Sequence, residues 1–267
     1  MKLRPVMKIH GGKYYLCNFI IENFPENYDK MTYVEGFGGA ASVLLNKKRS
    51  IKEVYSDLHG PTANIFLTLV TKPDELVETI RKIEYKEESF QAAKLASLAF
   101  QYNDLPSAVS ELVLRRMSRG GMKSHFSWST RLRGGQPGDL NAWETFKDLL
   151  PKIANRLQGV EVLNESALTL LPKFGQDDNT LVYLDPPYLH TTRTAKSVYD
   201  CEMTEEEHRK LAALANEAKA KVLVSGYDSP LYQELYNGWR VIKKEVPNNS
   251  GQGKVKQRRV ECLWLNY

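Results

Sequence analysis

Short apolar runs recur along the chain and predict the strands of a buried sheet. The clearest run is 181–184, and shorter ones lie near 32–35, 53–55, 160–163 and 222–224. A strand that is covered on both faces of a parallel sheet is apolar throughout. Between these runs, apolar residues recur at helical spacing over 14–23 and 62–70 and after Thr204, which with Glu207 forms a capping box. This alternation predicts an α/β fold with a mainly parallel sheet.

One long interruption divides the predicted strands into two groups. From about 71 to 157 the chain reads as mostly helical, with segments opening near Lys72-Pro73 and Pro106. Asn141 and Glu144 form a capping-box pattern that predicts a helix start, and Pro151 is expected to interrupt that helix. Residues 260–266 are long enough for an antiparallel edge strand. We therefore predict one unit made of 1–70 and 158–267, with an inserted subdomain at 71–157.

The sequence LVYLDPPY at 181–188 carries the most specific candidate chemistry. Asp185 follows the apolar strand directly, and in open α/β sheets ligands bind at the carboxyl ends of strands. Pro186 and Pro187 fix φ and carry no N–H, so their carbonyls remain available to a ligand amine. Tyr188 offers a flat face for stacking. The plainer interpretation is a strand-ending turn, because Asp and Pro are common turn residues.

These four residues suit the methylation of an exocyclic amino group on a planar base. The amine of adenine or cytosine is a poor nucleophile because its lone pair is delocalised into the ring. The Asp185 carboxylate and the Pro186 carbonyl would accept both N–H bonds and turn the lone pair toward an electrophilic methyl group. None of the five histidines shows metal-ligand spacing, so we expect no metal.

Two further segments predict a nucleotide-type cofactor. Residues 33–45, YVEGFGGAASVLL, run from a strand through Gly36, Gly38 and Gly39 into a helix-like stretch, so the backbone can approach a ligand closely. An ordinary strand–turn–helix junction would look similar. Asp57 follows the next strand about twenty residues later, where an acid can accept both ribose hydroxyls. Its alternative role is a helix N-cap before Pro61.

Taken in order, these segments resemble the DNA adenine N6-methyltransferases of the Dam type, whose cofactor motifs precede the catalytic motif. The resemblance begins at residues 8–13, KIHGGK, which are similar to that family's Lys-Trp-Ala-Gly-Gly-Lys. It continues through VEGFGGAASV, YSDLH, LVYLDPPY, KVLVSGYDS and RRVECLWLNY, so it spans nearly the whole chain. Ile9 departs from the family's tryptophan, which removes an aromatic contact and leaves its own role open.

The resemblance implies a Rossmann-like methyltransferase sheet, S-adenosylmethionine as cofactor and double-stranded DNA as substrate. The cofactor-binding residues that it implies are Ile9, Lys13, Glu35, Phe37, Gly38, Gly39, Asp57 and Asp185. The implied catalytic residues are Asp185, Pro186, Pro187 and Tyr188. The target base must leave the duplex to reach Asp185, and Tyr188 would stack on the extruded adenine. Cytosine N4 methylation is the nearest alternative, although such enzymes more often carry serine at the position of Asp185. The second alternative is a DNA-binding homologue that has lost catalysis.

The predicted insert contains the strongest basic stretch, residues 115–135, which has no acid and is interleaved with Phe126 and Trp128. Arginine pairs with guanine edges or phosphates, and a glycine-rich basic hairpin can enter a groove. A solvated basic loop is the plainer interpretation. Because Dam-type enzymes carry their target-recognition insert here, we expect DNA contacts from Arg115, Arg116, Arg119, Lys123, Arg131 and Arg133. Residues 254–259, with Lys243 and Lys244, form a second, less specific basic stretch.

Bulk properties agree with this interpretation. The chain has 267 residues, 37 basic and 32 acidic, for a net charge of +5, so the placement of charge matters more than the total. Its three cysteines are far apart, which predicts neither a disulfide framework nor a zinc site. No signal-like or membrane-spanning stretch is apparent, so we expect a cytoplasmic protein that is not bound to a membrane. No obligate protein partner is indicated.

Overall fold

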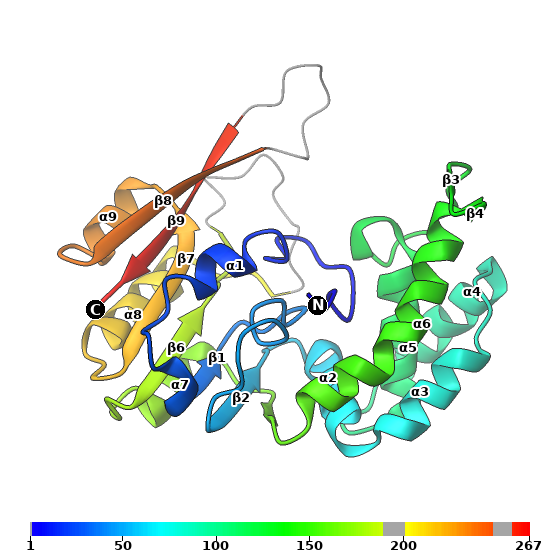
Figure 1. Ribbon diagram of the computed structural model, residues 1–267, viewed down its shortest axis with the longest axis horizontal. Helices are drawn as coiled ribbons and strands as arrows, with labels where there is room; N and C mark the ends of the chain where they lie inside the picture. The colour runs from blue at the N-terminus through cyan, green and yellow to red at the C-terminus, as the bar shows by residue number, and fades with distance from the viewer. Residues whose placement is uncertain (1, 189–200, 248–257) are drawn as a thin grey trace.

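The computed structural model describes residues 2–188, 201–247 and 258–267, and within them the fold is mixed α/β around one seven-stranded sheet (Figure 1). The strand order is β5-β2-β1-β6-β7-β9-β8. The first five strands of this order run parallel, and β9 is antiparallel to both β7 and β8. The predicted Rossmann-like class is therefore confirmed. The sheet strands are β1 Thr32–Glu35, β2 Lys52–Ser56, β5 Glu161–Leu163, β6 Thr180–Leu184, β7 Lys221–Tyr227, β8 Arg240–Pro247 and β9 Arg258–Leu265.

Helices cover both faces of this sheet because successive strand residues point to opposite sides. Tyr33, Tyr55 and Tyr183 belong to one buried cluster, which extends into the insert and α2. Their neighbours Val34 and Val182 belong to the other cluster, which is closed by the helices that follow β5, β6 and β7. The covering helices are α1 Cys17–Ile21, α2 Gly60–Thr71, α7 Ala167–Phe174, α8 Glu205–Asn216 and α9 Pro230–Leu235, with a short 3-10 helix at Tyr28–Lys30.

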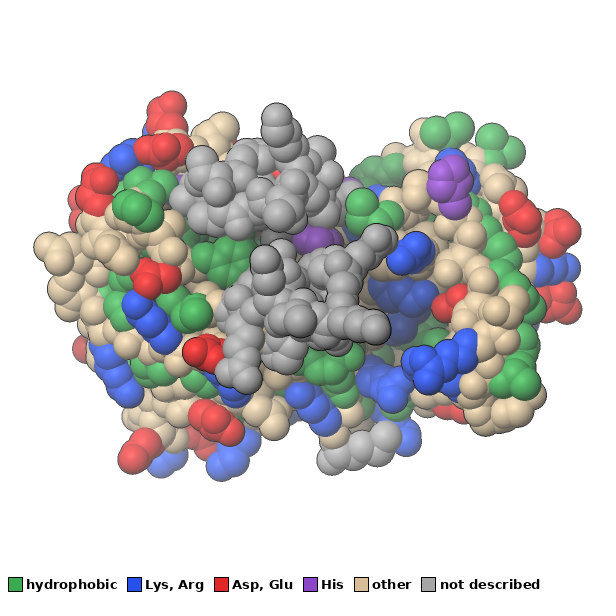
Figure 2. All heavy atoms as spheres, turned by 90° about the horizontal axis from the view of Figure 1, so that it is seen from above, with side chains coloured by type: hydrophobic (Ala, Val, Ile, Leu, Met, Phe, Trp, Pro, Cys, Tyr) green, Lys and Arg blue, Asp and Glu red, His purple; other side chains and the backbone are tan. Residues whose placement is uncertain are grey.

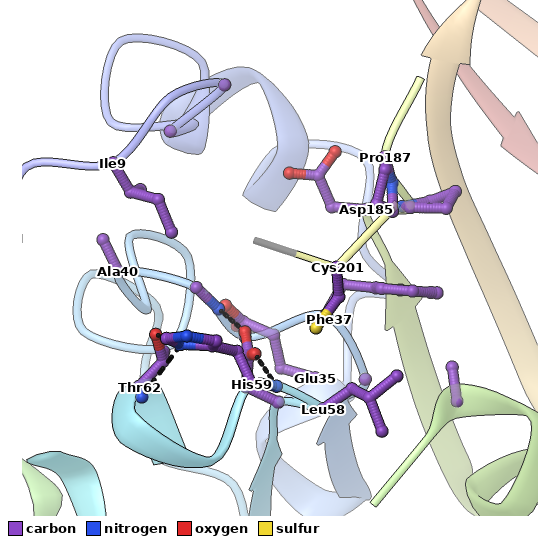
Figure 3. Close-up of a pocket in the computed structure, with 18 of the residues that line it drawn as sticks. Ile9, Glu35, Phe37, Ala40, Leu58, His59, Thr62, Asp185, Pro187 and Cys201 are labelled. Atoms are coloured by element: carbon purple, nitrogen blue, oxygen red, sulfur yellow. Dashed lines mark hydrogen bonds between the residues drawn. The ribbon is translucent and has the colours of Figure 1, made fainter. Parts of the chain in front are cut away.

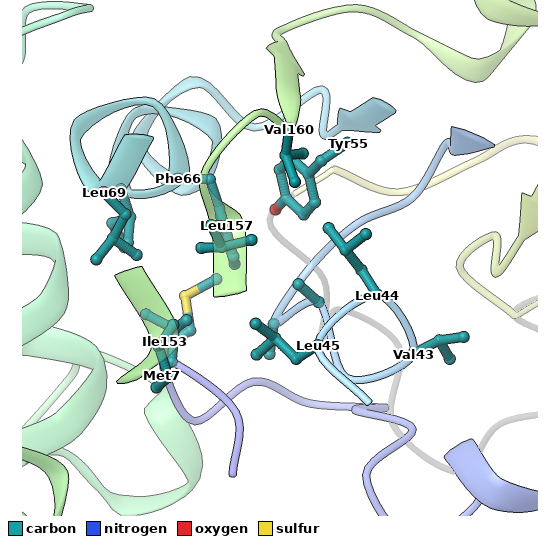
Figure 4. Close-up of a cluster of buried hydrophobic side chains, with 14 of the residues drawn as sticks. Met7, Val43, Leu44, Leu45, Tyr55, Phe66, Leu69, Ile153, Leu157 and Val160 are labelled. Atoms are coloured by element: carbon teal, nitrogen blue, oxygen red, sulfur yellow. The ribbon is translucent and has the colours of Figure 1, made fainter. Parts of the chain in front are cut away.

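The segment between α2 and β5 forms a helical layer beside the sheet, at the right of Figure 1. Its elements are α3 Pro73–Lys82, α4 Glu87–Ala96, α5 Leu105–Met117 and α6 Gly138–Leu157, 3-10 turns at Ser97–Ala99 and Arg119–Gly121, and a small hairpin of β3 Leu132–Arg133 and β4 Gln136–Pro137. Figure 4 shows how this layer joins the sheet unit: Ile153 and Leu157 of α6 lie close to Phe66 of α2 and to Met7. This layer occupies residues 73–157. That it is a separate target-recognition unit stays a proposal.

The structure corrects three local predictions. Helix α6 begins at Gly138, and Asn141 lies inside it rather than at its N-cap. Pro151 does not end that helix, which continues to Leu157 with Leu150, Ile153 and Leu157 buried, so packing outweighs the lost hydrogen bond. The last strand is not at an edge, because β8, which we did not predict, pairs with it and forms the edge itself. The capping box of Thr204 and Glu207 is confirmed.

Candidate functional site

A pocket opens where the strand order reverses, between β1 and β6. In doubly wound sheets the loops that leave two such strands diverge, and the crevice between them is where ligands bind. The pocket is lined by the loop after β1, the end of β2, the D-P-P segment after β6, residues 9–13 and residues 201–203. Figure 3 shows Asp185 and Pro187 on one side of this space, with Ile9, Glu35 and His59 around the other. Residues from both predicted motifs thus meet in one cavity.

Tight backbone packing fixes the glycine loop after β1. A Cβ on Gly38 would lie 2.1 Å from the Tyr55 ring, and Gly39 has a φ of +48°. Tyr55 also donates a hydrogen bond to the Gly39 carbonyl at 2.8 Å. The glycines are therefore required by close contact with β2 as well as by any ligand. Gly38, Gly39 and Phe37 all line the pocket.

Asp57 connects this loop to the end of β2. One of its carboxylate oxygens accepts from the Gly39 N–H and the other from the His59 N–H, both at 2.8 Å. The N-cap of α2 is not Asp57 but His59, whose ring nitrogen accepts from the Thr62 N–H. The alternative role of Asp57 as a helix cap is therefore wrong. Each carboxylate oxygen has two lone pairs, so the side chain can hold the loop and still accept from a ligand hydroxyl.

Glu35 is a buried acid at the end of β1. It accepts hydrogen bonds from the Tyr33 hydroxyl at 2.6 Å and from the Leu44 N–H at 2.9 Å. The two hydrogen bonds lower the pKa of Glu35, but burial has the larger effect and raises this pKa to about 8. The charge of Asp185 raises it as well. Glu35 is therefore mainly protonated at neutral pH, and it lines the same pocket.

Asp185 is held at the pocket by the ammonium group of Lys13. The Lys13 Nζ lies 2.8 Å from Asp185 Oδ1 and 4.6 Å from the centre of the Tyr188 ring. The side chains are only 7% and 17% exposed, so the pair is shielded from water. Burial raises the pKa of Asp185, and Lys13 opposes that rise. Lys13 also donates to the Gly11 carbonyl at 3.0 Å.

The remaining residues of the D-P-P-Y segment differ in their access to the pocket. Pro186 and Pro187 line it beside Asp185. Tyr188 is 6% exposed and lies behind Lys13, with its hydroxyl donating to Glu261 at 2.6 Å and its ring 4.3 Å from that of Tyr227. Ligand stacking on Tyr188 therefore requires movement of the Lys13 side chain.

Three of the six basic residues predicted to contact DNA are engaged inside the protein. Arg115 pairs with buried Glu111 at 2.8 Å, and Lys123 reaches the same carboxylate at 3.1 Å. The Arg116 guanidinium donates to the Val6 carbonyl at 2.7 Å and to the Pro5 carbonyl, and it lies 4.0 Å from the centre of the Phe146 ring. These contacts give the three side chains structural roles that the sequence did not reveal. Arg115 additionally lines the pocket.

Arg116 anchors what we call the N-terminal strap, residues 5–13. Lys8 of this strap donates to the Ser118 carbonyl at 3.3 Å. A Cβ on Gly121 would lie 2.0 Å from the Lys8 carbonyl oxygen, so the strap runs tightly against the Arg119–Gly121 turn. Beyond Lys8 the strap enters the pocket as Ile9 to Lys13. The insert therefore supports the segment that carries Lys13.

Arg119, Arg131 and Arg133 are exposed and remain available to a ligand. Arg133 belongs to the β3–β4 hairpin, whose two-residue turn is Gly134-Gly135 with φ values of +59° and +80°. Positive φ at both positions is the geometry of a type I′ turn, which glycine favours. Figure 2 shows Lys and Arg side chains gathered on the side of the helical layer that faces the sheet unit.

The structure also adds residues to the pocket that the sequence did not indicate. Leu58, His59 and Thr62 line it after β2, and Ser166 to Leu168 line it after β5. The rule that parallel strands end at a common edge would have identified both groups once the strands were known. Among residues 2–188, 201–247 and 258–267 there is no cluster of His, Cys, Asp and Glu suited to a metal ion. No helix in these ranges is long and apolar enough to cross a membrane.

Comparisons with known proteins agree with this geometry. A family model described as D12 class N6 adenine-specific DNA methyltransferase matches residues 10–249. The chain is 24% identical over 278 residues to the DNA adenine methylase of Haemophilus influenzae, covering 98% of this chain and 93% of the relative. It is 24% identical over 294 residues to the type II methyltransferase M.MjaIII of Methanocaldococcus jannaschii, covering 100% of both. It is 29% identical over 191 residues to the modification methylase StsI of Streptococcus sanguinis, covering 68% of this chain but 28% of that protein.

The chain therefore belongs to the D12 class N6 adenine-specific DNA methyltransferases. The resemblance to Dam-type enzymes that the motifs indicated is confirmed, and with it the reaction class, methyl transfer to adenine in DNA. The roles of the individual site residues stay proposals. So do the double-stranded state of the DNA substrate and the flipping of the target base.

Proposed function

We propose that the chain transfers a methyl group from S-adenosylmethionine to N6 of an adenine that has been flipped out of double-stranded DNA. The observation that supports this most directly is the shared cavity: the glycine loop, Asp57 and Asp185 all face it. A cofactor-binding loop and an amine acceptor in one cavity are what transfer between two bound molecules requires.

The side chains that line the pocket fit this cofactor. Asp57 faces the cavity at the place where a ribose would present its hydroxyls, and Ile9, Phe37 and Leu58 offer apolar contacts for an adenine ring. Glu35 and Asp185 provide carboxyl groups for a molecule that carries an ammonium and a sulfonium. When bound, the cofactor supplies an electrophilic methyl group.

Lys13 marks the position of the target amine in this proposal. Its ammonium group forms an ion pair with Asp185 and lies over Tyr188, the two contacts that we assign to the amino group and ring of adenine. An incoming adenine would displace the Lys13 side chain and take over both contacts. Loss of the Lys13 charge would also raise the pKa of Asp185 further, since that charge now opposes the effect of burial.

Asp185 and Pro186 then prepare the amine for reaction. The Asp185 carboxylate and the Pro186 carbonyl accept its two N–H bonds, which directs the lone pair of N6 toward the methyl carbon. The N–C bond forms as the carbon–sulfur bond breaks, with that electron pair remaining on sulfur. The methylated nitrogen has become acidic, and it gives one proton to Asp185 or to water. A carboxylate whose pKa is raised by burial is the better proton acceptor.

Base flipping follows from the burial of Asp185 and Tyr188. Both lie inside the protein, so N6 of a stacked base cannot reach them. Arg119, Arg131 and Arg133 are exposed and are proposed to contact the duplex. Arg115, Arg116 and Lys123 would support this surface from within, through Glu111 and the N-terminal strap.

The decisive experiment is product analysis with the purified full-length chain, S-adenosylmethionine and unmethylated DNA. We expect N6-methyladenine in the nucleoside digest, with duplex preferred over single strands. Added chelator should leave the rate unchanged, since the proposed chemistry needs no metal. A digest that contains methylcytosine and no N6-methyladenine would refute the proposal.

Base flipping can be tested separately with 2-aminopurine at the target position. Its fluorescence should rise when the protein binds, because unstacking relieves quenching. Asp185→Ala should keep this increase while losing turnover. The same variant is then titrated with the cofactor. Retained binding indicates an enzyme that has lost only its amine acceptor, whereas a DNA-binding homologue without catalysis need not bind the cofactor at all.

A further inference from the structure

Glu261 is a buried acid immediately behind the D-P-P-Y segment. It lies on β9, where it is paired in register with Tyr227 of β7 and Lys244 of β8. Its Oε2 accepts the Tyr188 hydroxyl at 2.6 Å, with Glu261 9% exposed and Tyr188 6% exposed. Glu261 does not appear among the residues that line the pocket. Its direct hydrogen-bond contact with the D-P-P-Y segment is the one with Tyr188.

The bond from Tyr188 to Glu261 holds the far end of the tyrosine ring in place. At the near end, Pro186 and Pro187 restrict the backbone that carries Tyr188. A buried phenol that donates to a carboxylate makes one of the shorter and stronger hydrogen bonds found in proteins. The ring of Tyr227, 4.3 Å away, limits rotation from one side. The orientation of Tyr188 thus depends on both ends of the side chain being held.

A buried carboxylate at this place has a cost that a purely structural residue would avoid. Its charge lies near enough to Asp185 to disfavour ionisation of that carboxyl group. Removing an acid from water is itself unfavourable unless the group is paired. A leucine or valine would complete the β7–β9 packing without either penalty. The bond to Tyr188 therefore gives this acid a role that an apolar side chain could not fill.

We propose that Glu261 is a positioning residue that holds the Tyr188 ring in the place required for stacking on the flipped adenine. This inference rests on the stacking role given to Tyr188 in the proposed function. It assigns to β9 a part in base recognition, although that strand contributes no residue to the cofactor pocket.

A double-mutant cycle on the full-length chain tests the proposal. The variants are Glu261→Ala, Tyr188→Phe and the double variant, and the measurement is the single-turnover methylation rate with saturating cofactor and DNA. Loss of a hydrogen bond to a charged group corresponds to a rate decrease of about tenfold or more. We expect each single variant to lose about that factor, and the double variant to be no slower than Tyr188→Phe. If Glu261→Ala lowers the methylation rate by the same factor in the wild type and in Tyr188→Phe, the proposal is refuted.

Further variants separate positioning from general damage. Glu261→Gln keeps an oxygen acceptor and should recover most of the rate lost in Glu261→Ala. The KM for the cofactor should stay within about twofold in all variants, because Glu261 lies outside that pocket. Tyr267→Phe is the matched control, since it removes a phenol that donates to the Asn23 carbonyl at 3.0 Å away from the site. If Glu261→Ala does not fold, Tyr188→Phe alone decides: a wild-type rate in that variant overturns the proposal.

Failure of this inference is distinguishable from failure of the proposed function. Tyr188→Ala removes the stacking ring altogether. A strong defect in Tyr188→Ala with a wild-type rate in Tyr188→Phe would leave stacking intact and refute only the role of Glu261. No defect in Tyr188→Ala would refute stacking itself. The identity of the methylated base is read independently from the wild-type digest.

Discussion

Replacing Glu35 with glutamine should change how the stability of the protein depends on pH. Glu35 is buried at the end of β1, and its pKa in the folded protein is about 8 against 4.5 for an ordinary glutamate. Between these two values the folded protein retains a proton that the unfolded chain has lost. Unfolding therefore releases a proton, and the free energy of unfolding must fall as pH rises through this window.

The size of the effect follows from the two pKa values. One pKa unit corresponds to about 1.4 kcal/mol, so this group lowers the free energy of unfolding by on the order of 5 kcal/mol at alkaline pH. Roughly 3 to 4 kcal/mol of that is lost between about pH 5 and pH 8. Glutamine is neutral throughout and can accept the same two hydrogen bonds from Tyr33 and Leu44. The variant should therefore lack this part of the pH dependence.

Denaturant unfolding of the wild type and Glu35→Gln across this pH range provides the test. The variant should gain stability relative to the wild type as pH rises, with the largest difference near pH 8. Glu78→Gln, an exposed substitution on α3, controls for a change of charge without burial. Parallel curves for the wild type and Glu35→Gln would refute the assignment of a protonated Glu35 and the argument from burial.

Four further substitutions have expected outcomes that follow from the contacts. Asp185→Ala should lower turnover by at least one order of magnitude while duplex binding, measured by anisotropy, is retained, because its hydrogen bonds act on the reacting amine. Gly38→Ala should weaken cofactor binding in a calorimetric titration and cost roughly 1–3 kcal/mol of stability, because its Cβ would meet Tyr55. Arg119→Ala should cost roughly 1–3 kcal/mol on the cognate site and reduce the ratio of cognate to non-cognate methylation. Arg116→Ala should instead lower stability by roughly 2–4 kcal/mol, since two strap carbonyls lose their donor, and leave that ratio unchanged.

Much of the sheet and the glycine loop beside the pocket could be predicted because their signals are local. The run at 181–184 is apolar throughout because β6 is buried on both faces, and the acid that follows it marks the carboxyl end. The capping box at Thr204 lies within four residues of sequence. Such patterns depend on neighbours along the chain, so a sequence contains them in full.

The features that escaped prediction depend on partners far away in sequence. Arg116 reads as one member of a basic run, yet its contacts are with residues 110 and 111 positions earlier. Strand β8 contains Lys243 and Lys244 and reads as a phosphate-binding stretch, because an edge strand need not be apolar. Pro151 lies in a helix that tertiary packing maintains. Glu261 and Tyr188 meet only because β9 pairs with β7, which in turn lies next to β6.

The insertion point of the helical layer has a consequence for how target preference could diversify. Parallel neighbours such as β2 and β5 must be joined by a crossover, and here α2 to α6 together form that crossover. Because β5 is the outermost strand at this end of the sheet, no other strand depends on what the crossover contains. A recombination event that exchanged this one segment would leave the strand order, the glycine loop and the D-P-P-Y motif untouched. Its new occupant would need to preserve a seat for the N-terminal strap and the side chains that reach the pocket, Thr62 of α2 and Arg115 of α5.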